Sequence, residues 1–282
     1  MSKKCEEMNR DLTIILVYMN GDLHYTCGGK VDLCMDKPVF KRKIYDEIYE
    51  WKENRSDKYA LLIKGARRVG KSTIAEEFAK KEFKSYILID FAHTSKAIID
   101  LFDDTYDLDF FFLQLQQLMG IRLYEKESVI IFDEVQLFPK ARQAIKYLVA
   151  DGRYKYIETG SLLSIKKNTK DILIPSEEHK ISMFPMDFEE FLWAIGDEVS
   201  AETIRHLIKN KKPAGNAMHR NLMRIFRLYM LVGGMPQAIE TYIEKNNLQL
   251  VDETKREIVD LYEEDFVKID GTGLAGDIYD AI

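Results

Sequence analysis

One stretch of eight residues constrains the fold of this chain more than any other. Gly65–Ser72 reads GARRVGKS, which has the form G-x-x-x-x-G-K-S, and Thr73 follows it. A short apolar run, Tyr59–Lys64, precedes the stretch, and apolar residues recur at helical spacing after it. A glycine loop between a strand and a helix is the context in which this pattern is a phosphate-binding loop rather than a chance match in a turn. We therefore predict a P-loop here.

Each residue type in the stretch suits a phosphate ligand. Glycines let the backbone curl so that its N–H groups point at phosphate oxygens, and the start of the helix adds partial positive charge. Lys71 would supply a point charge to the β- and γ-phosphates, and Ser72 a hydroxyl to a magnesium ion. The residues predicted to bind nucleotide are Gly65, Ala66, Arg67, Arg68, Val69, Gly70, Lys71, Ser72 and Thr73.

A second stretch, Val129–Glu134, consists of four apolar residues followed by two acids. A fully apolar run is typical of a central parallel strand that is covered on both faces, and ligands bind at the carboxyl ends of such strands. We predict that Asp133 holds magnesium, directly or through water, and that Glu134 orients and deprotonates the attacking water. The alternative is an ordinary strand that leads into an acidic helix cap, and the upstream P-loop disfavours it.

Composition limits the class of protein. The chain has 282 residues, which is enough for one large or two ordinary domains. Its net charge is -6, which does not favour a wholly basic surface for nucleic acid but leaves room for a local basic face. All three cysteines lie in the first 34 residues, as suits a reducing cytoplasm. The longest N-terminal apolar run, Leu12–Met19, is too short to span a membrane.

Further elements follow from hydrophobic periodicity and from Gly and Pro positions. We expect helices at Phe40–Trp51, at Phe110–Met119, after Pro139 and after Asp187, and strands at Ser85–Phe91, Tyr154–Ser161 and His179–Phe184. Thr159 and Ser161 share one face of their strand, so a hydroxyl there could sense the γ-phosphate. A simple turn at the strand end is the alternative.

The domain organisation is expected to be threefold. Residues 1–36 form an N-terminal extension, which is either a small hairpin or sequence upstream of a true start at Met35. Residues 1–34 are expected to be dispensable. Residues 37–196 would form the nucleotide-binding domain and residues 197–282 a helical second domain, whose last apolar pattern is incomplete. The helix expected at Ala217–Leu231 carries a stripe of Arg220, Arg224 and Arg227, which is either a solvated face or a surface that touches phosphate or DNA.

Five stretches, taken in order, are similar to one family. They are Gly65–Ser72, Ile131–Gln136, Glu158–Ser161, Pro185–Phe191 and Gly233–Pro236. Together they resemble the prokaryotic AAA-type ATPases whose C-terminal half is a domain of unknown function, and the resemblance covers about residues 37 to 282. The P-loop alone is generic, whereas the order of the five stretches is specific.

The resemblance implies a parallel α/β sheet of order 5-1-4-3-2 with helices on both faces, Mg-ATP as ligand, and a helical or winged-helix lid. By match, Ser72 and Asp133 hold the metal, Lys71 grips phosphate and Glu134 is the base. Thr159 is the expected first sensor, with Ser161 as the alternative. In related ATPases a Gly-x-Pro turn of the lid packs on adenine. Gly234–Pro236 resembles that turn, which makes Pro236 a nucleotide-binding candidate unless the turn only separates two helices.

One departure from the family concerns the arginine that a neighbouring subunit would supply. No arginine occurs between Arg153 and Arg205, and Lys166, Lys167 and Lys170 occupy that span instead. We therefore expect a cytoplasmic protein that binds Mg-ATP and hydrolyses it slowly as a switch, with an unidentified DNA or protein effector and with room for an oligomer. Two alternatives are a nucleotide-regulated DNA-associated or defence-system adaptor, and a small-molecule kinase, which Glu134 beside Asp133 disfavours.

Overall fold

The computed structural model describes six ranges of the chain, and it describes side chains only between residues 39 and 266. The described ranges are 15–19, 22–27, 30–31, 39–103, 107–161 and 175–269. The chain falls into two compact units, Met1–Pro38 and Val39–Ile282. None of the helices in these ranges is long and apolar enough to cross a membrane.

The first unit contains a small antiparallel sheet of order β1-β2-β3. Its strands are β1 (Ile15–Met19), β2 (Asp22–Cys27) and β3 (Lys30–Val31). Met19 pairs with Asp22, so β1 and β2 form the hairpin that was one of two expectations for this segment. A start at Met35, and the dispensability of the residues before it, stay predictions.

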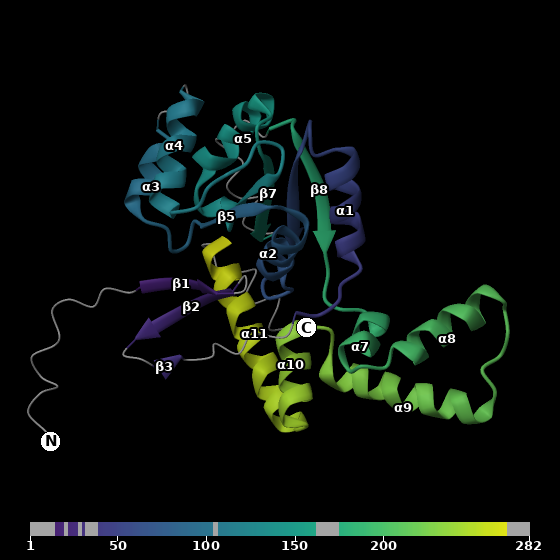
Figure 1. Ribbon diagram of the computed structural model, residues 1–282. Coiled ribbons are helices and arrows are strands. Elements are labelled where there is room, and N and C mark those ends of the chain that lie inside the picture. The colour runs from purple at the N-terminus through teal and green to yellow at the C-terminus, as the bar shows by residue number, and fades with distance from the viewer. Residues whose placement is uncertain are drawn as a thin grey trace, which may run out of the picture. The chain divides into compact units, whose positions relative to one another are not determined.

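The second unit is built on a five-stranded parallel sheet of order β5-β6-β7-β4-β8 (Figure 1). The strands are β4 (Ala60–Gly65), β5 (Ser85–Asp90), β6 (Ser128–Asp133), β7 (Lys155–Ser161) and β8 (Glu178–Met183). Numbered along the chain from β4 and taken from the β8 edge, this order is 5-1-4-3-2, which confirms the expected topology. All residues of β6 and β7 are buried. The apolar run of β6 predicts this burial, whereas β7 also buries the polar residues Lys155, Glu158, Thr159 and Ser161.

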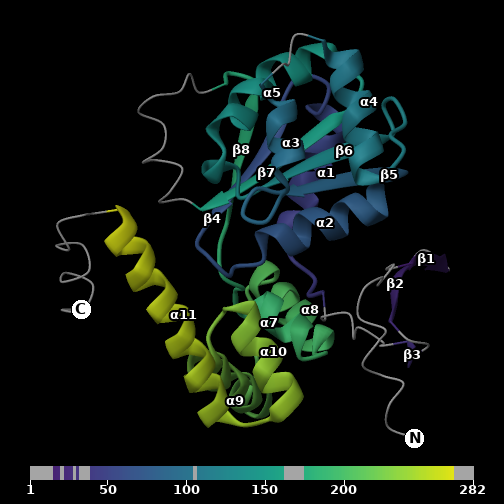
Figure 2. The ribbon, with the colours of Figure 1, turned by 90° about the vertical axis from the view of Figure 1, so that its left-hand side faces the viewer.

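Helices cover both faces of this sheet (Figure 2). One layer consists of α1 (Ile44–Asn54) and α2 (Lys71–Glu82), and the other of α3 (Lys96–Leu101), α4 (Leu108–Met119) and α5 (Pro139–Asp151). Trp51 and Phe78 are buried in the core of the first layer, and Phe111 and Phe112 in that of the second. Each side chain of this size contributes about 1.5–3 kcal/mol when it is fully buried.

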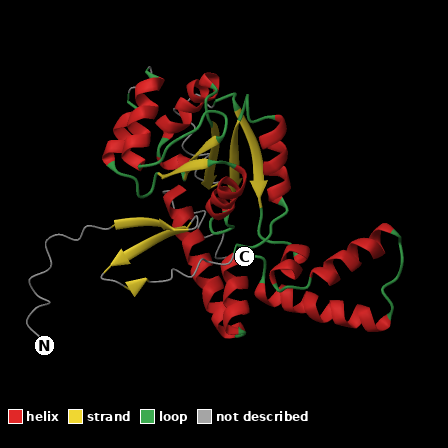
Figure 3. Ribbon diagram, viewed as in Figure 1, coloured by secondary structure: helices red, strands yellow, loops and turns green. Residues whose placement is uncertain are grey.

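The region after β8 is helical throughout its described part, as expected (Figure 3). It consists of α7 (Phe188–Ala194), α8 (Glu198–Lys209), α9 (Asn216–Val232), α10 (Pro236–Lys245) and α11 (Leu248–Ile269). A core of its own includes Phe191, Ile225 and Ile239. Asp187 caps α7 in a capping box with Glu190, as the Pro-Met-Asp sequence predicts. The domain boundary at residue 196 stays a prediction.

Two helices begin two or more residues away from where they were expected. The first helix begins at Ile44 rather than Phe40, and the side chain of Arg42 donates hydrogen bonds to the carbonyl oxygens of Val69 (2.8 Å) and Phe184 (2.6 Å). A tertiary contact therefore keeps the first residues out of the helix although their periodicity continues it. The helix expected at Phe110 begins at Leu108 because the side chain of Asp107 accepts from the N–H of Phe110 and caps it.

Candidate nucleotide site

The P-loop of the second unit needs its two glycines for different reasons. Gly70 has φ +95°, a left-handed conformation that glycine adopts without strain, and α2 begins at the next residue. At Gly65 the constraint is space, since a Cβ atom there would lie 2.3 Å from the carbonyl oxygen of Met183 in β8. The first glycine therefore lets two parallel strands run close together, and the second shapes the loop.

Lys71 is buried at the start of α2, with 5% of the residue exposed. Its ammonium donates to the carbonyl oxygens of Ala66 (2.9 Å) and Gly65 (3.3 Å), so the charge lies inside the loop. Burial lowers the pKa of Lys71, and the neighbouring carboxylates of Glu134 and Asp133 act against that shift. This placement is the one that a phosphate-binding lysine requires.

A hydroxyl network joins the P-loop to the end of β6. The Ser72 hydroxyl donates to Asp133 Oδ1 at 2.7 Å, and the Thr159 hydroxyl donates to the same oxygen. The N–H of Glu134 in turn donates to Thr159 Oγ1 at 3.3 Å. A hydroxyl beside a carboxylate is a donor set of hard oxygen ligands, which fits Mg²⁺. Ser72 and Asp133 are thus brought together as the sequence predicts.

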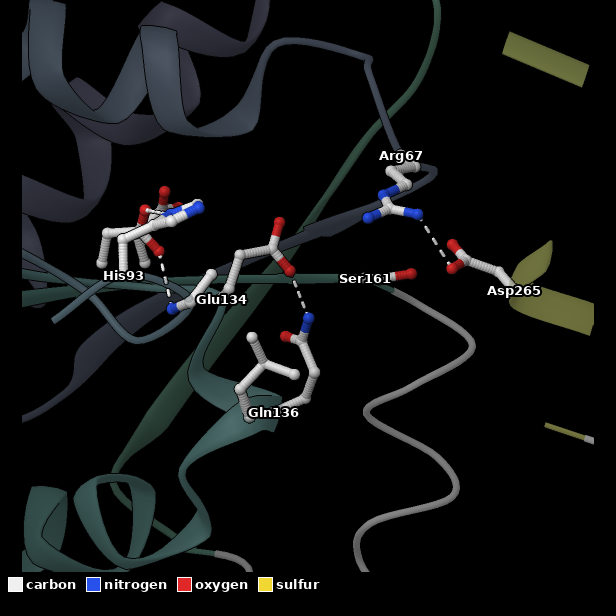
Figure 4. Close-up of a pocket in the computed structure, with 10 residues that line it drawn as sticks. Arg67, His93, Glu134, Gln136, Ser161 and Asp265 are labelled. Atoms are coloured by element: carbon white, nitrogen blue, oxygen red, sulfur yellow. Dashed lines mark hydrogen bonds and ion pairs between the residues drawn. The ribbon is translucent and has the colours of Figure 1, made fainter. Parts of the chain in front are cut away.

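A cavity of about 370 Å³ opens at the carboxyl edge of the sheet (Figure 4). Strand register explains its position, because Asp90 pairs with Asp133 and Gly65 pairs with Ser161. The cavity is lined by Arg67, Asp90, Ala92, His93, Asp133, Glu134, Gln136, Leu137, Ser161 and Asp265. Ser161 therefore faces the cavity, whereas Thr159 is fully buried behind Asp133. The sensor assignment of either residue stays a prediction.

Residues 57–192 match the model of a protein family described as an AAA domain. By this match, the part of the chain that contains the P-loop is an AAA-type domain. Two solved structures that resemble the chain are the Walker-type ATPase paby2304 of Pyrococcus abyssi and PCH-2 of C. elegans. The first is 17% identical over 80% of this chain and 73% of its own, with a TM-score of 0.46. The second is 12% identical over 81% of this chain and 70% of its own, with a TM-score of 0.40. No curated protein matches the chain.

Several residues around the AAA-domain cavity were not predicted from the sequence. Asp90 accepts from the N–H of Ala92 (2.8 Å) and from the ring of His93 (2.7 Å) at the end of β5. The side-chain amide of Gln136 donates to the carboxylate of Glu134 (Figure 4). A position near the end of an expected strand could have suggested Asp90, but nothing local distinguishes Asp265, which lies on α11.

The Gly-x-Pro turn of the helical region lies beside the P-loop of the AAA domain. A Cβ atom added to Gly70 would lie 3.8 Å from the ring of Pro236, and Arg68 Nη1 lies 3.4 Å from Gln237 Oε1. The turn also starts a helix, since Pro236 is the first residue of α10. Gly234 has a packing role, because its added Cβ would lie 2.2 Å from the Met186 carbonyl oxygen. The turn can therefore separate two helices and still lie close enough to the P-loop to contact a nucleotide.

The basic residues that the sequence singled out lie elsewhere or outside the described ranges. Arg220, Arg224 and Arg227 are exposed on α9, and the first two donate hydrogen bonds within that helix. Lys166, Lys167 and Lys170 lie outside the described residues. A different arginine, Arg67 of the P-loop, lines the cavity beside Asp133 and Glu134.

Proposed function

We propose that this chain binds Mg-ATP and hydrolyses it slowly, as a nucleotide-dependent switch. The observation that carries the proposal is the meeting of the P-loop, Asp133 and Glu134 around one cavity at the carboxyl edge of the sheet. Ligands bind at this edge in open α/β sheets. The AAA-domain match over residues 57–192 supports nucleotide binding independently of that geometry.

Each group at this site would have a separate role. Lys71 and the N–H groups of the P-loop would hold the phosphates, since they supply positive charge and donors at a helix start. Ser72 and Asp133 would hold magnesium, which when bound neutralises phosphate charge. Glu134 would accept a proton from the attacking water. Thr159, with Ser161 as the alternative, would report on the terminal phosphate from the end of β7.

Slow turnover is proposed on two grounds. The carboxylate of Glu134 already accepts a hydrogen bond from Gln136, so an attacking water must compete for it. In addition, the span where a neighbouring subunit's arginine is expected contains lysines, and an ammonium cannot form the two-pronged contact of a guanidinium. Together these features favour a protein that holds nucleotide for long periods.

Replacement of Lys71 by alanine is expected to weaken ATP binding by about tenfold or more, because each charge-assisted bond contributes roughly 1.5–3 kcal/mol. Isothermal titration calorimetry with Mg-ATP measures the change. Lys80→Ala is the matched control, since Lys80 lies on the same helix and forms an exposed ion pair with Glu76, away from the cavity lining. Equal affinity of Lys71→Ala and the parent chain would exclude this binding role.

Replacement of Pro236 by alanine is expected to speed nucleotide release several-fold, because the rigid ring would no longer lie against the P-loop. Stopped-flow release of a fluorescent ATP analogue measures the rate, and circular dichroism checks the fold. Pro139→Ala is the control, since Pro139 also begins a helix, α5, but lies outside the cavity lining. If both variants release nucleotide at the parent rate, the turn serves only to separate two helices.

The DNA-associated adaptor remains the second candidate, favoured by the exposed arginine stripe on α9. Binding that rests on phosphate contacts weakens steeply with salt. A titration of DNA affinity against salt concentration therefore distinguishes an adaptor from a protein whose stripe is only solvated. The small-molecule kinase is excluded if phosphate is released to water with no phosphorylated product.

A further inference from the structure

The cavity at the P-loop is lined by an unbalanced set of charges. Four carboxylates belong to it, those of Asp90, Asp133, Glu134 and Asp265. Among the described lining residues, Arg67 is the only lysine or arginine. A triphosphate that enters this space meets strong repulsion from the carboxylates. The position of the Arg67 guanidinium therefore has a large influence on which nucleotide is accepted.

The helix α11 holds Arg67 by two separate contacts. Its Asp265 Oδ1 lies 3.0 Å from Arg67 Nη1, although the two residues are 198 positions apart in the chain (Figure 4). One turn earlier, the hydroxyl of Tyr262 donates to the backbone carbonyl oxygen of Arg67 at 2.9 Å. One contact restrains the side chain and the other the backbone. Both contacts thus join α11 to the same P-loop residue.

The contact with Asp265 places an anion in the nucleotide cavity itself. The Asp265 side chain is 15% exposed, against 40% for Arg67, and its negative charge acts on the nearby Lys71 ammonium as well. A phosphate group and Asp265 would compete for the same guanidinium, which matches the geometry of phosphate as well as that of carboxylate. The terminal phosphate, which ATP has and ADP lacks, carries additional negative charge. ATP therefore competes with Asp265 for the Arg67 guanidinium more strongly than ADP does.

We propose that Arg67 is a catalytic arginine supplied by the P-loop itself, which contacts the terminal phosphate of ATP, and that Asp265 is a positioning residue that withholds Arg67 when this phosphate is absent. The inference rests on the proposed function and deepens it. It gives the chain an arginine that the span between Arg153 and Arg205 does not contain, and turnover is still slow because Arg67 must first leave Asp265. It also gives α11 a means to respond to ATP but not to ADP.

The reaction that Arg67 would assist is a simple displacement. The water oxygen forms a bond to the terminal phosphorus, and the bond from that phosphorus to the bridging oxygen breaks. ADP leaves with the bonding electron pair, and Glu134 accepts a proton from the water. Arg67 would stabilise the charge that spreads over the three terminal oxygens, and no covalent change occurs at Arg67 or at Asp265.

The test is calorimetric binding of Mg-ADP and of a non-hydrolysable Mg-ATP analogue. Arg67→Ala is expected to lower the affinity for the triphosphate by about tenfold or more, because one charge-assisted contact is lost. The affinity for ADP should fall much less. Asp265→Asn keeps the shape of the side chain but removes its charge. It is therefore expected to raise the affinity for the triphosphate several-fold more than the affinity for ADP. In the double variant the gain from Asp265→Asn should disappear, because Asp265 acts through Arg67.

Two further variants complete the test. Asp252→Asn removes a surface pair with Arg256 on the same helix and should leave the ratio of the two affinities unchanged. Arg67→Lys keeps the charge without the two-pronged contact, and single-turnover hydrolysis should fall by about tenfold or more, which is part of the roughly 10³–10⁵-fold that such arginines supply. Thermal melting checks that each variant is folded.

The results separate this inference from the proposed function. If the parent chain binds neither nucleotide, or binds both independently of Lys71, the proposed function is wrong. If binding depends on Lys71 but Asp265→Asn shifts the triphosphate and ADP equally, or keeps its gain without Arg67, then the nucleotide-sensing role of Asp265 is wrong and the proposed function stands. Unchanged triphosphate affinity in Arg67→Ala removes Arg67 from the phosphate contacts.

Discussion

Replacement of Glu134 by glutamine is expected to slow ATP hydrolysis by about 100-fold or more, the lower part of the range for loss of a general base. Affinity for ATP should not weaken, because glutamine keeps the shape of the side chain, removes one of the negative charges that repel the triphosphate, and leaves the phosphate contacts of the P-loop in place. Glu134 has φ +53° and lies between Asp133 and the short helix Val135–Leu137, so its backbone already fixes where the side chain points. The variant removes the base and leaves that geometry intact.

Single-turnover hydrolysis and calorimetric ATP binding, measured on the same preparation, separate the two effects. Glu127→Gln is the matched control, since Glu127 is an exposed glutamate that precedes the same strand and pairs with Lys84. Its rate should equal that of the parent chain. A Glu134→Gln variant that also turns over at the parent rate would show that another group accepts the proton, and Asp133 would then be examined next.

Local sequence signals were sufficient for the P-loop and the strand that ends in Asp133. Both consist of residues that are adjacent in the chain, and parallel strands bring their carboxyl ends to one edge of the sheet. Ser72 and Asp133 could therefore be placed together without any structure. The order of the strands, in contrast, came from a resemblance to known ATPases, because hydrophobic periodicity says nothing about which strands are neighbours.

Long-range side-chain pairs were beyond the reach of the sequence. Asp265 lies on α11, in the region that was expected to be helical, but a sequence pattern cannot state that its carboxylate meets Arg67 across 198 positions. The same holds for Arg42, which contacts Val69 and Phe184 and thereby delays the start of α1. Tertiary contacts decide these features, and they override local propensity where the two disagree.

Glu158 is a further residue whose environment could not be predicted. It lies on the central strand β7, is fully buried, and both of its carboxylate oxygens are without a hydrogen-bond partner in the described part of the chain. Burial raises the pKa of Glu158 well above its ordinary value, and the nearby carboxylate of Glu178 adds to the shift. Glu178 itself is fully buried and accepts two hydrogen bonds from Arg142 of α5, at 2.7 and 2.8 Å.

This cluster predicts how stability depends on pH. The pKa of Glu158 is higher in the folded chain than in the unfolded one, so between the two values the folded state binds a proton that the unfolded state does not. The free energy of unfolding therefore falls as pH rises through that window. Glu158→Gln cannot ionise, so its free energy of unfolding should vary less with pH above the ordinary glutamate range, and at neutral pH it should equal or exceed that of the parent.

Replacement of Arg142 by methionine should have the opposite effect and a larger one. Methionine fills most of the space but leaves the carboxylate of Glu178 buried without its two-pronged partner, and the loss of one member of a buried pair costs about 3–5 kcal/mol. Lys180, 3.3 Å from Glu178 Oε2, would replace only part of that interaction, because its side chain is 41% exposed and it approaches one oxygen alone. Urea denaturation at neutral pH gives the free energy of unfolding.

The double variant Arg142→Met with Glu178→Leu is the control, and it should recover most of the lost stability because no unpaired charge then remains between α5 and β8. If Arg142→Met unfolds at the parent urea concentration, or if the double variant is no more stable than the single one, the buried pair is not what holds α5 to the edge of the sheet.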